Sequence, residues 1–448
     1  MHDYLCRRVG INVRDFGRKE ICVMKKLSYG ASGPEVERLQ LALCRAGYGP
    51  LKIDGVFGRG TRCALSAFQL DRRMAGDGAV GPETASALRP WLRGCIEYNV
   101  RRGDTPYAVA LRYGVGLRAL ETANPAMDPT QLRAGEKLTV PLPFSVVPAG
   151  VSFDSALVAD CVRGLALRYP FLDVRSFGRS VMGRALWALE LGRGPRMVAY
   201  SAAHHANEWI TAPLLLKFAE ELCEAAASGG SIRRIKAEEI LSSARLCIVP
   251  AVNPDGIDLV TGALAEGEYY SAAERVAAEF PDIPFPSGWK ANIAGTDLNL
   301  QYPAGWERAK EIKYALGYDR PAPRDFVGPA PLSAPESRAL CSLTRSLSPD
   351  MVIALHTQGE VIYWRYQGME PPDARHYAEC FAAASGYALD DAPDESGFAG
   401  YKDWFIAEFA RPGYTVECGL GENPLPVSDF EEMYRRVRGI LVLAAAGC

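Results

Sequence analysis

Residues 151–448 alternate between apolar runs typical of buried strands and stretches in which apolar residues recur at helical spacing. The run at 197–201 is followed by helically spaced apolar residues from Leu214 to Leu222, with Pro213 in the first turn. Further strand-like runs lie at 246–249, 351–355 and 414–417. This alternation restricts the region to an α/β fold, in which we expect a mixed sheet layered with helices.

A short repeat within residues 31–92 indicates a small helical unit. The segment DGVFGRGT at 54–61 returns as DGAVGPET at 77–84. Both copies are glycine-rich turns that end on a threonine, and we expect Thr61 and Thr84 each to cap the helix that follows. Because apolar residues recur at helical spacing around both turns, the pattern predicts a compact unit of three α-helices.

Residues 97–143 predict a second small unit with a β-α-α-β order. Its expected elements are a strand at 98–100, helices at 108–113 and 117–123, and a closing strand at 135–141. Thr105 is placed to cap the first of these helices, and Asn124-Pro125 ends the second. Clustered prolines at Pro141, Pro143 and Pro148 then predict a linker.

The charges of the chain are nearly balanced, with 50 Lys and Arg residues against 53 Asp and Glu residues and a formal net charge of −3. A chain with a pI of about 6.1 lacks the broad basic field of a nucleic-acid-binding protein, so we expect no nucleic-acid partner. No apolar run approaches the roughly 18 residues that a membrane span needs, so we expect none.

The cysteines and the N-terminal residues favour a reducing compartment. The 12 cysteines are widely scattered and include no CxxC pair, which favours reduced, mostly buried thiols over disulfides. Residues 1–23 are basic and polar and lack the apolar core of a secretory signal. We therefore predict an N-terminal extension at 1–23, with Met24 as an alternative start, and a cytoplasmic location.

Three of the five histidines lie just beyond predicted strands. His204 and His205 follow the first strand-like run, and His205 and Glu208 form a His-x-x-Glu pair, while His356 ends another run. Sites in open α/β sheets collect at the carboxyl ends of strands, and two histidines with one glutamate are a zinc ligand set that leaves a coordination position open. From these residues alone, a metal site and a structural role are both possible.

Four motifs resemble those of the M14 metallocarboxypeptidase family. They are HANEW at 205–209, NPDG at 253–256, GTDLN at 295–299 and PGYTVE at 412–417. The resemblance implies one zinc ion per chain, with His205, Glu208 and His356 as its ligands. It also implies that Glu417 is the general base, and it assigns His204 a structural role.

Two positions depart from the family's pattern. Lys290 follows Trp289 where the family carries an arginine, and the resemblance implies that this lysine stabilises the oxyanion as a point charge. A solvated surface lysine is the alternative. The family holds the terminal carboxylate of its substrate with an Asn-Arg pair, whereas this chain has Asn299-Leu300. Leucine cannot neutralise a carboxylate, so we do not expect tight capture of an ordinary C-terminus.

The segments 297–306 and 321–329 resemble the M14 branch of γ-D-glutamyl-meso-diaminopimelate peptidases. This resemblance implies cleavage of the γ-D-glutamyl–diaminopimelate bond in the stem peptides of bacterial cell walls. The candidate substrate-binding residues are Asn299, Arg365 and Tyr401, and a surface salt bridge is an equally good interpretation of Arg365. A metallocarboxypeptidase and a non-catalytic wall-binding protein are the alternative functions.

The two N-terminal units resemble wall-binding modules. The repeated turn in 31–92 is similar to that of the peptidoglycan-binding domain, and the GDT, NP and GxxLxVP elements of 97–143 are similar to those of the LysM module. We therefore predict a peptidoglycan-binding domain at 24–95, a LysM domain at 96–146 and a catalytic domain at 147–448. The implied partners are the glycan and the stem peptides of peptidoglycan, and the lack of an export signal leaves action during sporulation or after lysis open.

Overall fold

The computed structural model describes residues 26–448, so the predicted extension at 1–23 and the alternative start at Met24 lie outside the described residues. The chain forms two compact units. The first combines the chain up to Val151 with Ala159–Asp173 and Cys223–Gly230, and the second contains Ser152–Val158, Val174–Leu222 and Ser231–Cys448. Helices α7 (Ser155–Arg168) and α8 (Thr211–Ser228) contribute residues to both units.

Within the described residues, the first unit contains the three predicted helices, α2 (Pro34–Arg45), α3 (Arg59–Asp71) and α4 (Pro82–Arg93). Each helix turns an apolar stripe inward, and Leu39, Phe68 and Leu88 are fully buried. Helix α4 ends at Gly94, which adopts the left-handed conformation with φ +68°. Glycine is favoured there because an L-residue is strained at positive φ.

A buried glutamine holds each of the repeated turns. The Nε2 atom of Gln40 on α2 lies 3.0, 3.1 and 3.2 Å from the Asp54 carboxylate, the Val56 carbonyl and the Thr61 hydroxyl. Its Oε1 atom accepts hydrogen bonds from the backbone N–H groups of Asp54 and Gly55. The Gln40 side chain therefore bonds to groups along the whole turn and holds them together.

The second turn is held in the same way by Gln69 on α3. Its Nε2 atom lies 2.9, 2.9 and 3.1 Å from the Asp77 carboxylate, the Ala79 carbonyl and the Thr84 hydroxyl, and its Oε1 atom accepts from Gly78 N–H. The repeat in the sequence thus corresponds to a repeated hydrogen-bond network around one amide.

The predicted role of the two threonines is wrong. Helices α3 and α4 begin before Thr61 and Thr84, with Gly58 and Gly81 at the N-cap positions. Both threonines therefore lie inside the first helical turn, and their hydroxyl groups accept hydrogen bonds from the buried glutamines. The sequence repeat could not reveal this because the glutamines lie outside the repeated segments.

The β-α-α-β order of the next module is confirmed. It contains β1 (Cys95–Asn99), α5 (Pro106–Tyr113), α6 (Leu117–Ala123) and β2 (Lys137–Pro141), and β1 pairs antiparallel with β2. Thr105 caps α5 as predicted, because its hydroxyl accepts from Ala108 N–H at 3.1 Å. Asn124 bonds through its side-chain amide to the Leu120 carbonyl and to both backbone groups of Thr139, which ties the end of α6 to β2.

The second unit is built on an eight-stranded mixed sheet with the order β11-β10-β12-β9-β5-β8-β4-β3. The strands are β3 (Asp173–Arg179), β4 (Ala185–Gly192), β5 (Arg196–Ala202), β8 (Ala244–Val249), β9 (Met351–His356), β10 (Val361–Tyr363), β11 (Ala388–Asp390) and β12 (Gly413–Glu417). The neighbours β12, β9, β5 and β8 are mutually parallel, whereas β10 and β4 pair antiparallel with β12 and β8. A short hairpin of β6 (Ser231–Ile232) and β7 (Ile235–Lys236) stands apart.

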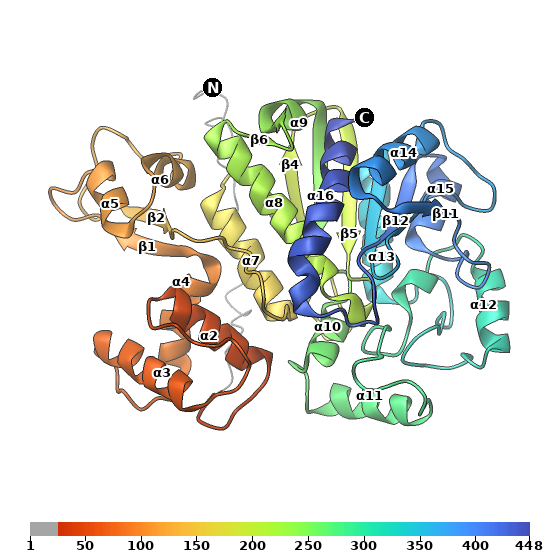
Figure 1. The fold of residues 1–448 in the computed structure, drawn as a ribbon, viewed down its shortest axis with the longest axis horizontal. Coiled ribbons are helices and arrows are strands. Elements are labelled where there is room, and N and C mark those ends of the chain that lie inside the picture. Colours follow the sequence, from red (N-terminus) through yellow and green to blue (C-terminus); the bar gives the residue numbers. More distant parts are fainter. Residues whose placement is uncertain (1–25) are drawn as a thin grey trace. The chain divides into compact units, whose positions relative to one another are not determined.

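Helices cover both faces of the central strands. Met197 and Ala199 of β5 lie in one apolar cluster with Leu340 of α13 (Pro335–Leu347) and with Trp404 of α15 (Tyr401–Phe409). Tyr200 lies on the opposite face, where its ring is 5.6 Å from Phe218 of α8 and its hydroxyl donates to the Leu441 carbonyl of α16 (Phe430–Ala446). Figure 1 shows α8 and α16 crossing over the strands. The predicted α/β domain with a mixed sheet layered by helices is confirmed.

The remaining helices of this unit lie between its strands along the chain. They are α9 (Ala237–Ser243), α10 (Pro254–Thr261), α11 (Glu268–Ala278), α12 (Trp306–Ala315) and α14 (Ala374–Ser385), with 3₁₀ turns η2 (Ala206–Glu208), η3 (Leu298–Leu300) and η4 (Val427–Asp429). Among residues 26–448, no helix combines the length and the hydrophobicity that a membrane span requires.

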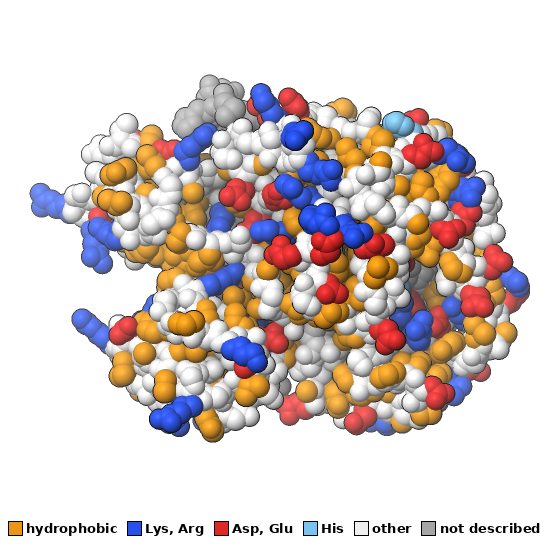
Figure 2. Space-filling view, viewed as in Figure 1, with side chains coloured by type: hydrophobic (Ala, Val, Ile, Leu, Met, Phe, Trp, Pro, Cys, Tyr) orange, Lys and Arg blue, Asp and Glu red, His pale blue; other side chains and the backbone are white. Residues whose placement is uncertain are grey.

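The distribution of surface charges and the state of the cysteines are as the sequence led us to expect. Figure 2 shows basic and acidic side chains interspersed over the visible face, in keeping with the formal net charge of −3. Every cysteine within the described part of the chain is a free thiol. Most of these thiols are buried, namely Cys95, Cys161, Cys223, Cys247, Cys341 and Cys418.

We expect Gln40→Ala or Gln69→Ala to lower the free energy of unfolding of the first unit by about 2–3 kcal/mol, because each change removes the hydrogen-bond partner of a buried glycine N–H and of a buried threonine hydroxyl. Denaturant unfolding measures the loss, and hydrogen exchange of the Gly55 or Gly78 amide reports it locally. Gln131→Ala, at an exposed glutamine of the same unit, is the matched control. Equal stability of all three variants would contradict this role of the glutamines.

Candidate active site

Three parallel strands bring the predicted site residues to one edge of the sheet. Strands β5, β9 and β12 are neighbours, and their carboxyl ends point the same way. His205 lies just beyond the end of β5, where it is the N-cap of the 3₁₀ turn that carries Glu208. His356 is the last residue of β9 and is the register partner of Glu417, the last residue of β12.

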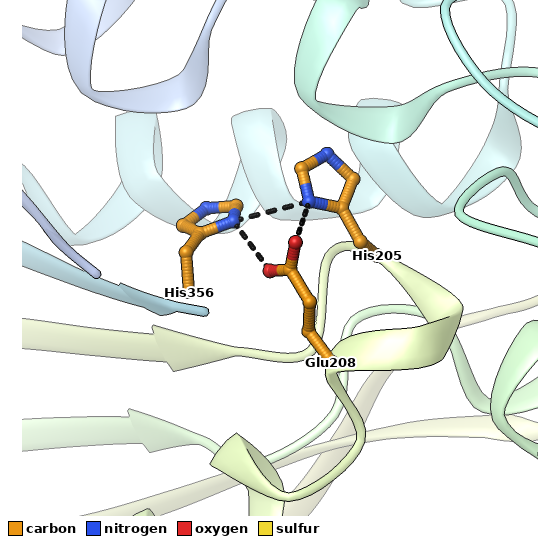
Figure 3. A group of neighbouring side chains, drawn as sticks. All are labelled: His205, Glu208 and His356. Carbon is orange, nitrogen blue, oxygen red and sulfur yellow. Dashed lines mark hydrogen bonds and ion pairs between the residues drawn. The ribbon is translucent and has the colours of Figure 1, made fainter. Parts of the chain in front are cut away.

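His205, Glu208 and His356 converge at this edge (Figure 3). The His205 Nδ1 atom lies 2.8 Å from Glu208 Oε1, the His356 Nδ1 atom lies 3.0 Å from Glu208 Oε2, and the two Nδ1 atoms are 3.2 Å apart. All three residues are buried. Among residues 26–448 they form the one group of three or more potential ligands with donor atoms within 4.8 Å of one another.

The geometry of this group fits zinc. Ligand atoms bound to zinc at about 2.0–2.1 Å in a tetrahedral arrangement lie about 3.3 Å from one another. The donor atoms of the three residues are separated by 2.8 to 3.2 Å, close to that spacing. Two imidazoles and one carboxylate are also a donor set that zinc accepts while keeping one position for water or substrate.

Asp297 fixes the imidazole of His205. Its Oδ1 atom lies 3.2 Å from His205 Nε2, and its Oδ2 atom accepts from Asp325 N–H at 3.2 Å. With Nδ1 facing the ligand group, Nε2 carries the proton and donates to Asp297. Burial alone raises the pKa of Asp297, but the charge of His205 and its hydrogen bond lower it below the usual value. This partner orients the ring and increases its basicity as a ligand.

The loop that carries His205 is held by Asn253, the first residue of the NPDG segment. Its Nδ2 atom donates to the carbonyls of His204 and Ala291 at 3.2 and 3.0 Å, and its Oδ1 atom caps α10 by accepting from Gly256 N–H. A Cβ atom on Gly256 would lie 2.7 Å from the Cβ of Ala206. Only glycine therefore lets α10 approach the zinc-ligand loop this closely.

Lys290 and Glu417 flank the ligand group. The Nζ atom of Lys290 lies 3.1 Å from Glu208 Oε1, so this lysine lies in the centre and is not a solvated surface residue. The side chain of Glu417 is partly exposed, at the end of β12. Burial of its carboxyl group and the nearby charge of Glu208 raise the pKa of Glu417 to about 8. A carboxyl group beside the ligand group is placed to accept a proton and to return it.

His204 does not belong to the ligand group. Its ring is fully buried and stacks on the ring of His356, with centroids 5.3 Å apart and an interplanar angle of 21°. Within residues 26–448 neither ring nitrogen has a hydrogen-bond partner. Burial lowers the pKa of His204 well below its usual value, and the charges of His356 and His205 lower it further, so the ring is neutral. It supports His356 by packing.

Tyr401 packs behind the ligand group, with its ring 5.6 Å from that of His204, and its predicted role in substrate binding stays a prediction. Only 2% of its surface is exposed, and it packs in the apolar core beneath the sheet. Its hydroxyl is 2.8 Å from the Thr344 hydroxyl. Its backbone N–H donates to the side-chain oxygen of Asn299 at 3.0 Å, so the Asn299 amide oxygen is engaged in holding the start of α15.

Arg365 takes the alternative role, a surface salt bridge. Its Nε atom donates to Asp391 Oδ1 at 2.8 Å, and its Nη2 atom bonds the other oxygen of the same carboxylate. The guanidinium also lies over the ring of Trp364, 5.0 Å from its centroid. Within the described chain, no hydrogen bond or ion pair joins Arg365 to the ligand group.

Leu300 is buried in an apolar cluster. It packs with Trp306, Ala309, Val327 and Ala399 and is 6% exposed. An arginine at this position would have to place a charged group where these apolar side chains now meet. The carboxylate-binding arginine of a carboxypeptidase is therefore absent from this position, and apolar side chains surround the leucine that replaces it.

The functional importance of Asp297 and Asn253 was missed in the sequence. Both residues lie in motifs that carry the family resemblance, but the motifs alone do not say which side chain each contacts. Asp297 bonds a histidine far away in the sequence, and Asn253 bonds two carbonyl groups on separate loops. For Asn253, the available signal was a polar residue in a short motif just after a buried strand.

Comparisons with known proteins agree with this geometry. Residues 158–433 match the zinc carboxypeptidase family, Peptidase M14. Residues 32–88 match a peptidoglycan-binding domain, and residues 98–141 match the LysM domain. The thrombin-activatable fibrinolysis inhibitor shares the fold, with a TM-score of 0.52 at 17% identity over 66% of this chain and 74% of that one.

Two bacterial relatives are similar over most of their length. The chain is 38% identical over 301 residues to the gamma-D-glutamyl-L-diamino acid endopeptidase 1 of Lysinibacillus sphaericus, covering 67% of this chain and 74% of the relative. It is 36% identical over 338 residues to the uncharacterized protein YqgT of Bacillus subtilis (strain 168), covering 75% and 86%. Since the family match spans more than half of the chain and the His-Glu-His group fits zinc, the chain belongs to the M14 zinc carboxypeptidase family and is a zinc metallopeptidase.

Proposed function

We propose that this metallopeptidase cleaves the γ-D-glutamyl–diaminopimelate bond of peptidoglycan stem peptides. The observation that carries the proposal is the pairing of an assembled His-Glu-His group with a buried leucine at position 300. The centre has the side chains for amide hydrolysis, but it lacks the charged group that would require a free C-terminus one residue beyond the cut. The name of the Lysinibacillus sphaericus relative, an endopeptidase for gamma-D-glutamyl-L-diamino acid bonds, supports the same substrate class.

The two N-terminal domains fit a polymeric substrate. Peptidoglycan-binding and LysM domains indicate that the chain binds peptidoglycan. A domain attached to the wall raises the effective concentration of stem peptides around the catalytic centre. This arrangement suits an enzyme that cuts within wall peptides better than one that trims the ends of ordinary proteins.

Each residue of the centre has a specific task in the proposed mechanism. His205, Glu208 and His356 hold the metal, and Asp297 keeps the His205 ring in the required orientation. Zinc, when bound, supplies a Lewis acid that polarises a carbonyl group and lowers the pKa of water. Glu417 takes the proton of the attacking water and later delivers it to the leaving amine. The Lys290 ammonium stabilises the negative charge that develops on the carbonyl oxygen.

We expect the enzyme to cut a γ-D-Glu–diaminopimelate tetrapeptide and to release the fragment that begins with diaminopimelate. Mass analysis of the products identifies the bond. Glu417→Gln should reduce turnover by about 10²-fold or more while keeping its zinc, since glutamine cannot accept the proton. An α-linked L-peptide of equal length is the control substrate for the wild-type enzyme. Stepwise removal of its C-terminal residues, with the stem peptide left intact, would replace the proposal with a carboxypeptidase function.

Asp297→Asn should weaken zinc binding by about 10- to 100-fold, because the amide keeps the shape of the side chain but loses the charge that orients and polarises His205. Competition with a chelator measures the affinity. Asp319→Asn, at an exposed carboxylate that pairs with Arg320, is the matched control and should bind zinc normally. Unchanged zinc affinity in Asp297→Asn would show that the contact with His205 is not functional.

In the metal-free protein, Glu417 should make the free energy of unfolding depend on pH. The folded state keeps this proton up to a pKa of about 8, whereas the ordinary value is 4.5. The folded state therefore binds more protons between these values, so the metal-free wild type loses stability as pH rises through this window. Glu417→Gln should lose only the part of this effect that comes from Glu417, so its stability should fall less steeply with pH than that of the wild type. Thermal unfolding of both metal-free proteins across the window tests the difference, and parallel pH curves would contradict it.

A further inference from the structure

The proposed substrate brings negative charge into a centre that already contains several carboxylates. Glu208, Asp297 and Glu417 lie around the metal group, and Lys290 is engaged with Glu208. The γ-linked D-glutamate keeps a free α-carboxylate on the acyl side of the bond. A free carboxylate among these acidic groups needs a cation to receive it.

The segment 323–326 is bound into the centre by its backbone. The carbonyl of Pro323 accepts from the N–H groups of Lys290 and Ala291 at 2.8 and 2.9 Å. Asp325 N–H donates to Asp297 Oδ2 at 3.2 Å, and Asp297 N–H donates to the Phe326 carbonyl at 2.9 Å. Arg324 is therefore held between the Lys290 segment and the carboxylate that orients His205.

The side chain of Arg324 has hydrogen-bonding capacity left for a ligand. Its Nε atom donates to Asp325 Oδ2 at 2.7 Å, and this is its one hydrogen bond to the described part of the chain. The other oxygen of Asp325 pairs with Lys313 Nζ at 2.6 Å, so this carboxylate is shared between two cations. The Arg324 side chain is 44% exposed, and its two terminal nitrogens are unused.

The backbone at Asp325 has an uncommon conformation. Its φ is +65°, in the left-handed region that non-glycine residues rarely adopt. This conformation is held by the hydrogen bond from Asp325 N–H to Asp297 and by the ion pair with Lys313. Strained residues are retained where the surrounding structure enforces a particular side-chain direction, here that of the Arg324–Asp325 pair.

We propose that Arg324 is a specificity-determining residue that binds the α-carboxylate of the γ-linked D-glutamate; this inference rests on the proposed function. In the proposed mechanism Lys290 stabilises the carbonyl oxygen of the scissile bond, and the α-carboxylate belongs to the same acyl side of that bond. Arg324 adjoins the Lys290 segment through Pro323. A guanidinium with two free terminal nitrogens matches a carboxylate in a bidentate arrangement, which an α-amide cannot reproduce.

The test compares two stem tetrapeptides that differ at the D-glutamate, one with a free α-carboxylate and one with an α-amide. The wild type should prefer the free carboxylate by about 10- to 100-fold in kcat/KM, the range expected for a hydrogen bond to a charged group. Arg324→Gln should lose this preference by slowing cleavage of the carboxylate substrate, mainly through KM. Arg324→Lys should keep part of it, because the charge remains.

Arg320→Gln is the matched control. Arg320 lies on the same stretch of chain, is half exposed and pairs with Glu279 at 2.7 Å, so its removal should leave the preference unchanged. Zinc content and thermal unfolding of every variant establish that the fold and the centre are intact. If Arg324→Gln does not fold, the reduced preference of Arg324→Lys and the wild-type preference decide the question.

A third tetrapeptide, amidated at the side-chain carboxylate of diaminopimelate, separates the two carboxylates of the substrate. Whatever preference the wild type shows for the free over the amidated diaminopimelate carboxylate, Arg324→Gln should show the same preference. If Arg324→Gln instead loses only this second preference, or if the wild type cuts both D-glutamate variants equally well, the assignment of Arg324 is overturned. If the wild type cuts none of the stem peptides, the proposed function itself fails.

Discussion

Parallel pairing of β5, β9 and β12 is the constraint on which the catalytic centre depends. Because these neighbouring strands end at the same edge, residues far apart in the sequence meet there without any long loop to position them. The register places Glu417 directly beside His356, and the turn after β5 carries His205 and Glu208 to the same point. A shift of β12 by one residue would turn Glu417 to the opposite face of the sheet.

Burial of many ionisable groups is the second constraint. Glu208 contacts both histidines and Lys290, and Asp297 contacts His205, so each charge has at least one opposite partner. Removing one partner would leave a buried charge uncompensated, which costs more than the pair itself contributes. The same low-dielectric environment raises the pKa of Glu417 and strengthens every interaction with a developing charge. Stability and chemistry therefore depend on the same contacts.

Much of the fold and part of the site could be predicted from local patterns. Apolar runs located the central strands, and Thr105 was identified as a helix cap because capping depends on residues close in sequence. The roles of Thr61 and Thr84 were predicted wrongly. Gln40 and Gln69 reach the threonines from other segments, and Tyr401 is turned into the core by the packing of α15. Local sequence contains no information on such contacts.

The sequence by itself determined the α/β class, the two wall-binding modules and the residue types that can bind zinc, because periodicity, turn chemistry and short motifs are local properties. Tertiary structure alone decided that Asp297 orients His205, that Asn253 holds the zinc-ligand loop, and that Arg365 pairs with Asp391 away from the centre. It also decided that Arg324 borders Lys290. These relations depend on how distant segments cross at one edge of a sheet, and hydrogen bonds and charges act over distances in space and not along the chain.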